Sequence, residues 1–190
     1  MNKDSNIGRF LVVALMVVLA GIYRILPHPI NFSPVGAMAL FGGAYFANRI
    51  SSFIIPLVTL WISDLVINNV IFAQYYPKFT WFYDGFYWVY GSFILIACIG
   101  WMLKGKIKIW SVPMAAISGS ILFFVVTNFG VWISGTMYPL NLSGLVLCYT
   151  AAIPFFSATL LGDLLFSALL FGIFELLQKR FEVLQVVKIS

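Results

Sequence analysis

The sequence predicts an all-α fold, a polytopic bundle of about six transmembrane helices, and two observations lead to this prediction. Of the 190 residues, 62% are hydrophobic and only 9% are charged, whereas soluble domains carry about 25% charged residues. The hydrophobic residues also gather in runs long enough to cross a bilayer, which takes about 20 residues. A lipid bilayer is therefore the partner and solvent that suits this chain.

The elements follow one another without a low-complexity linker, so we expect a single integral membrane domain over residues 1–190. Pro27 ends the first apolar run, and Ser33-Pro34 opens the second, because serine caps free amides and proline suits a first helical turn. The final run, 144–177, exceeds one span, so we expect Pro154 to split off a short outer segment, 144–153. The predicted spans are 10–26, 34–48, 52–72, 86–103, 109–133 and 154–177.

The basic residues predict the orientation. With six spans, nine of them fall on the side that holds both chain ends: Lys3, Arg9, Arg49, Lys104, Lys106, Lys108, Lys179, Arg180 and Lys188. Only Arg24 and Lys78 fall on the other side. Because cytoplasmic loops carry the excess of Lys and Arg, we expect both termini in the cytoplasm.

A cleaved signal peptide is the competing interpretation of the N-terminal region, with Val18-Leu19-Ala20 as the cleavage site. The apolar run of 10–26 is longer than the usual core of such a peptide. Cleavage would also remove a span on which the charge count depends. We therefore expect this run to remain as the first span.

Several function classes lack their motifs. The chain has no GxxxxGK[ST] phosphate loop, no GxSxG and no HExxH. Cys98, Cys148 and His28 do not form a cluster with metal-ligand spacing. Basic residues are not interleaved with aromatic ones as in a nucleic-acid reader. We therefore expect no metal, no cofactor and no nucleic acid.

Two carboxylates, Asp64 and Asp163, lie inside apolar runs, where a charge costs about 2.5–3.5 kcal/mol. In the six-span arrangement both lie about 12–14 Å below the outer boundary, so they can meet across the bundle. Arg24 is the only basic residue within an apolar run, which makes it the expected partner of one carboxylate. Thr159 and Ser167 share a helix face with Asp163.

These groups predict a ligand pocket in the outer half of the bundle, roofed by aromatic and polar outer loops such as the one with Tyr83. The alternative is that the carboxylates are structural contacts and the aromatic residues form the interfacial belt. The ligand-binding candidates are Arg24, Asn31, Trp61, Asp64, Asn68, Asp84, Asn128, Trp132, Tyr138, Asn141 and Asp163.

Small residues repeat every four positions in the second span, at Ala39, Gly43 and Ala47. Such a ladder lets two helices approach closely. It predicts either packing within the protomer or contact with a partner subunit.

Four stretches carry a family resemblance: 31–37 (NFSPVGA), 61–64 (WISD), 127–132 (TNFGVW) with Tyr138-Pro139, and 152–156 (AIPFF). With them the chain resembles an uncharacterised family of bacterial membrane proteins described as transport proteins. That family is distantly similar to the S components of energy-coupling factor (ECF) transporters. The resemblance implies an S-component-like bundle that captures a vitamin-like nutrient from the outer side, with scaffold and ATPase subunits as partners. The first span lacks the Ala-x-x-x-Ala pattern through which S components typically meet that scaffold.

Our leading hypothesis is a membrane transport protein, not an enzyme, that binds a small nutrient. A structural or assembly subunit without a ligand is the first alternative, and it would depend on the small-residue ladder rather than on the carboxylates. An intramembrane enzyme that uses the carboxylates for acid–base chemistry is the second.

Overall fold

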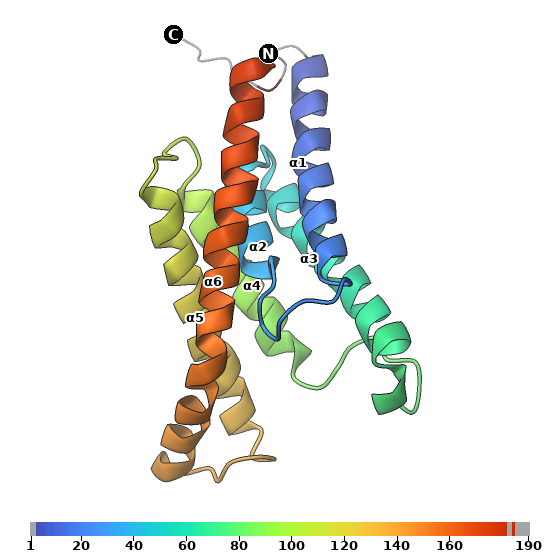
Figure 1. Ribbon diagram of the computed structural model, residues 1–190, viewed down its shortest axis with the longest axis vertical. Coiled ribbons are helices and arrows are strands. Elements are labelled where there is room, and N and C mark those ends of the chain that lie inside the picture. The colour runs from blue at the N-terminus through green and yellow to red at the C-terminus, as the bar shows by residue number, and fades with distance from the viewer. Residues whose placement is uncertain (1–2, 182–183, 185–190) are drawn as a thin grey trace.

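A computed structural model describes residues 3–181 and 184 of the chain, and this part contains helices and no strand. Figure 1 shows the helices as an elongated bundle in which α6 runs almost the full length. The helices are α1 (Lys3–Tyr23), α2 (Val35–Tyr45), α3 (Arg49–Val66), η1 (Ile67–Ile71), η2 (Ala73–Tyr75), α4 (Phe86–Met102), α5 (Ser111–Ile133) and α6 (Leu142–Arg180). The predicted all-α class is confirmed.

Four of these segments are long and apolar enough to cross a membrane: α1, α3 with its continuation η1, α5 and α6. Large apolar side chains face outward along them, including Leu11, Ile62 and Leu161, each more than half exposed. A soluble protein rarely exposes apolar surface on this scale. The apolar helices and their apolar outer faces indicate a membrane protein.

The second helix differs from its predicted span. We expected 34–48, but α2 has 11 residues, about 16 Å at 1.5 Å per residue, or roughly half of a bilayer core. It packs against all five other α-helices, and all its residues except Gly36 are buried. It ends early because Phe46 adopts an extended backbone, and Asn48 then caps α3 by accepting from the Ile50 amide at 2.9 Å.

A close backbone contact joins α2 to α4. A Cβ on Gly43 would lie 2.2 Å from the Ala97 carbonyl oxygen, and a Cβ on Gly100 would lie 2.1 Å from the Leu40 carbonyl oxygen. Neither helix could approach so closely with larger residues. Two members of the predicted ladder, Ala39 and Gly43, are therefore used inside the protomer.

The third member of the ladder does not belong to this contact. Ala47 lies beyond the end of α2 and is exposed. Its carbonyl oxygen accepts from Lys104 Nζ at 2.8 Å. The predicted ladder therefore holds only up to Tyr45, where α2 ends.

The expected break at Pro154 is wrong, because α6, which is 39 residues long, runs through this proline without interruption. Proline removes one backbone hydrogen bond, and a long membrane helix tolerates that loss when its neighbours support it. At its start, Asn141 Oδ1 accepts from the Gly144 amide at 2.8 Å. At about 58 Å, α6 is longer than a bilayer core, and its first turns project with the end of α5 beyond the other helices (Figure 1).

The start of α1 and the end of α6 lie at the same end of the molecule (Figure 1). Contacts gather basic residues there: Arg9 Nη1 donates to the Leu184 carbonyl at 3.2 Å, and Arg49 lies 4.0 Å over the Trp101 ring. Lys104 Nζ reaches the carbonyl oxygens that end α2. Of the nine residues predicted on this side, Lys188 lies outside the described residues.

Candidate functional site

A cavity of about 230 Å³ lies beside the start of α2. We call it the central cavity. Its wall mixes polar and apolar side chains drawn from the α1–α2 loop, α2 to α6 and the loop before α4. The lining residues are Arg24, Asn31, Ser33, Val35, Gly36, Leu60, Tyr83, Val89, Phe93, Ile96, Phe123, Thr159 and Asp163. This mixture is typical of a small-molecule site.

An ion pair holds Arg24 at the wall of the central cavity. Its Nη2 lies 2.8 Å from Asp64 Oδ1, and its Nη1 donates to Ser63 Oγ and to the Leu60 carbonyl. The second carboxylate oxygen of Asp64 accepts from the Tyr90 hydroxyl at 2.8 Å. The pairing that we expected of Arg24 is therefore present, and Asp64 is its partner.

Asp163 has a different environment, at the N-terminus of α2. Pro34, the residue before that helix, supplies no side-chain cap. Instead the Asp163 carboxylate accepts from the amides of Gly36 and Ala37 and from Ser120 Oγ at 2.6 Å. A negative charge is stabilised at a helix N-terminus because the free amides and the helix dipole both favour it.

Gly36 makes this cap possible, since a Cβ on it would lie 2.3 Å from Asp163 Oδ1. Asp163 is 4% exposed, yet it still lines the central cavity. It therefore anchors α2 and presents a carboxyl group to the cavity at the same time.

The two carboxylates do not share partners. Asp64 is bound by Arg24 and Tyr90, whereas Asp163 is bound by Ser120 and the start of α2. Asp64 lies behind Arg24 and is not among the lining residues. The cavity therefore carries a guanidinium, already paired from behind, and a separate carboxylate, rather than a carboxylate dyad.

Two hydroxyl groups at the cavity are available to a ligand. Ser33 Oγ is buried and has no hydrogen-bond partner within the described part of the chain. Burial and, to a smaller degree, the charge of Asp64 raise the pKa of Tyr83 above its ordinary value. The Tyr83 hydroxyl therefore stays protonated near neutral pH and can donate a hydrogen bond.

A second cavity, also of about 230 Å³, adjoins the first between α5 and α6. We call it the aromatic cavity. Its lining residues are Asn31, Phe123, Phe124, Thr127, Asn128, Ala152, Phe155, Phe156 and Thr159. Asn31, Phe123 and Thr159 line both cavities. Asn31 adopts a left-handed backbone, with φ of 63°, a conformation that asparagine tolerates better than most residues.

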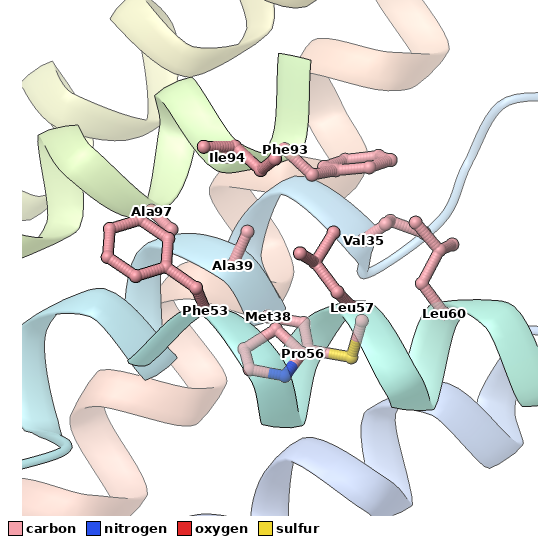
Figure 2. Close-up of a pocket in the computed structure, with 10 residues that line it drawn as sticks. All are labelled: Val35, Met38, Ala39, Phe53, Pro56, Leu57, Leu60, Phe93, Ile94 and Ala97. Carbon is pink, nitrogen blue, oxygen red and sulfur yellow. The ribbon is translucent and has the colours of Figure 1, made fainter. Parts of the chain in front are cut away.

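The apolar side of the central cavity continues into a small gap between α2, α3 and α4. Figure 2 shows Val35, Leu60 and Phe93, which also line the central cavity, among the side chains around this gap. Its volume is about 10 Å³, at the lower limit for one water molecule, and its lining offers no polar side chain. The gap is therefore too small and too apolar to be a ligand site.

Seven predicted candidates lie outside both cavities: Asp64, Trp61, Asn68, Asp84, Trp132, Tyr138 and Asn141. The two tryptophans hold loops in place, because Trp61 Nε1 donates to the Trp81 carbonyl at 3.3 Å and Trp132 Nε1 to the Pro139 carbonyl at 3.0 Å. Asn141 is the cap of α6, Asn68 is buried on η1, and Asp84 is exposed. Four candidates do line a cavity: Arg24, Asn31, Asn128 and Asp163.

Sequence reasoning missed three residues of the site. Ser120 and Tyr90 hold the two carboxylates, and Ser33 supplies the unpartnered hydroxyl. Serine and tyrosine are common in membrane helices and interfacial belts, so nothing in their positions alone distinguished them. Helical spacing placed both Thr159 and Ser167 on the face of Asp163, and of these two only Thr159 lines the cavities.

A family model matches most of the chain. Residues 4–184 match the model of a family of unknown function, DUF6580. No curated protein and no solved structure matches the chain. The family description names no activity, so a function has to be argued from the geometry of the two cavities.

Proposed function

The chain belongs to the family of unknown function DUF6580, and from that premise we propose that it is a transport protein of the bacterial inner membrane that binds a small nutrient from the outer side. The ligand occupies the central cavity and the adjoining aromatic cavity. The observation that carries the proposal is a central cavity of about 230 Å³ that holds Arg24, Asp163 and the unpartnered Ser33 hydroxyl within an apolar bundle.

The proposed topology has six crossings with both termini in the cytoplasm. The short helix α2, together with the loop before it, makes the second crossing. The basic residues gathered near the start of α1 and the end of α6 support this orientation. In it, the cavity lies beyond the start of α2, in the half of the membrane away from the cytoplasm.

The lining indicates the chemistry of the ligand. Arg24, Ser33, Tyr83 and Asp163 offer donors and acceptors at one end, while Phe124, Phe155 and Phe156 offer an aromatic surface at the other. A small amphipathic molecule with an apolar ring and a hydrogen-bonding end fits this pair of cavities. Phosphate-rich ligands fit poorly, because Arg24 is already paired and the other ionisable group of the lining, Asp163, is a carboxyl group rather than a cation.

The proposal is tested by the thermal stability of detergent-purified protein in the presence of a panel of water-soluble vitamins and related small nutrients. One compound class should raise Tm in a dose-dependent way, since a ligand that binds only the folded state stabilises it. Asn31→Gly keeps the left-handed backbone and removes the side chain, so affinity should fall about tenfold for one lost hydrogen bond.

A threonine pair gives the matched control. Thr159→Val should weaken binding, since Thr159 lines both cavities. Thr150→Val should not weaken binding, because Thr150 lines neither cavity. The two threonines are otherwise alike, since each donates to the carbonyl four residues before it in α6, Thr159 to Phe155 and Thr150 to Val146. If no compound shifts Tm, or if both threonine variants bind equally well, the proposal is wrong.

The resemblance to S components adds a proposal about partners, namely scaffold and ATPase subunits that drive release into the cell. Ala39 and Gly43 are buried within the protomer, so the partner surface would be the outward face of α1 or another helix. Co-purification of tagged protein from its native membrane, followed by identification of an ATPase, tests this. The assembly-subunit alternative loses its main motivation for the same reason, because the ladder is used internally.

A further inference from the structure

A further hollow lies between the start of α5 and the second half of α6, and it shares no lining residue with the two cavities of the proposed site. We call it the lateral groove, and its volume is about 560 Å³. The buried side chains of Val112 and Phe171 lie at its floor, while Ile109, at its rim, is 83% exposed. Gly172 leaves it open, because a Cβ there would meet nothing within 4 Å.

Charge is confined to one end of the lateral groove. Lys108 comes from the α4–α5 loop and Lys179 from the last turn of α6, and both are exposed. Glu175 also borders the groove, but its Oε1 accepts from the Tyr45 hydroxyl at 2.5 Å, which directs the carboxylate toward α2. The mouth of the groove is therefore basic, and its remaining length is apolar apart from Ser167.

The dimensions match one leaflet of a bilayer. On α6 the lining residues run from Leu164 to Lys179, about 22 Å along the helix. Half of a bilayer, headgroups included, is about 20–22 Å. Trp110, which is 76% exposed and follows Lys108 by two residues, is of the type that lies at the headgroup level.

We propose that the lateral groove binds one anionic phospholipid, with an acyl chain along α5 and α6 and its phosphate between Lys108 and Lys179. A basic pocket between membrane helices suits an anionic headgroup, and an apolar groove of one-leaflet length suits the acyl chain. A zwitterionic lipid would gain the apolar contacts but less of the electrostatic attraction. The site does not depend on the proposed nutrient site, because the two share no lining residue.

The test compares lipids on the intact, delipidated protein in detergent. Phosphatidylglycerol should raise Tm by about 5 °C at a concentration near 100 times its Kd, and phosphatidylcholine should raise it much less. The double variant Lys108→Gln/Lys179→Gln should lose the difference between the lipids. Lys106→Gln, in the same loop but outside the groove, should keep it.

A second variant blocks the groove without touching a charge. Gly172→Leu places a side chain in open space, so the lipid-free Tm should stay near that of the parent protein while the phosphatidylglycerol shift disappears. Gly91→Leu is the matched control, since a Cβ at Gly91 also meets nothing and Gly91 is outside the groove. Equal shifts from both lipids, a shift that survives in both groove variants, or a dimer that Gly172→Leu disrupts would each overturn the proposal.

Discussion

At the scale of single residues, the ion pair between Arg24 and Asp64 decides the shape of the central cavity. Both side chains are mostly buried, at 16% and 7% exposed. Removing one partner of such a pair leaves an uncompensated charge and costs about 3–5 kcal/mol. We therefore expect Asp64→Asn to lower Tm sharply even without ligand, and Arg24→Gln/Asp64→Asn to recover part of that loss.

The measurement is a double-mutant cycle on the free energy of unfolding in detergent, which isolates the coupling between the two residues. Asp84→Asn is the control, because it makes the same chemical change at an exposed position. If Asp64→Asn unfolds at the temperature of the parent protein, then the pair does not support the cavity wall.

At the scale of elements, α2 is held by its close contact with α4. A methyl group on Gly43 would meet the backbone of Ala97 at 2.2 Å, and the backbone of a packed helix cannot move aside as a flexible side chain can. Gly43→Ala should therefore destabilise the protein by about 1–3 kcal/mol. Gly91→Ala should be neutral or slightly stabilising, because α4 gains helix propensity there without a clash.

Both variants are compared by Tm and by the dose dependence of ligand stabilisation. If the contact positions the start of α2, Gly43→Ala should weaken ligand binding as well, since Val35 and Gly36 line the central cavity. A Gly43→Ala protein as stable as Gly91→Ala would show that α2 can withdraw from α4 without cost.

At the scale of the whole molecule, the proposed orientation in the membrane rests on the distribution of basic residues. In a background with Cys98 and Cys148 replaced by serine, Lys78→Cys should react with a membrane-impermeant maleimide on intact spheroplasts. Lys106→Cys should react only after the membrane is opened. It lies in the loop that contacts the end of α2, which is on the cytoplasmic side in the proposed topology. Labelling of both on intact spheroplasts, or the reverse pattern, would contradict two cytoplasmic termini.

Much of the fold could be predicted, because the composition and the length of the apolar runs directly indicate that the chain lies in a lipid bilayer. The ends of α4 and α5 lie within about two residues of the predicted limits. The predictions failed where contacts between helices outweigh the local sequence signals for where a helix ends. Pro154 stays inside α6, and α2 stops at Tyr45, because neighbouring helices and caps outweigh propensity at these points.

The sequence by itself determined that the chain is a helical membrane protein, and it indicated that Arg24 pairs with a carboxylate, since isolated charges in apolar runs need partners. Only the tertiary structure decided which carboxylate pairs and what the other one does. Asp163 caps α2 because Gly36 leaves room for its carboxylate, which also accepts a hydrogen bond from Ser120 on α5. Such contacts join residues more than 40 positions apart, and side-chain packing between helices, rather than any local pattern, sets their distances.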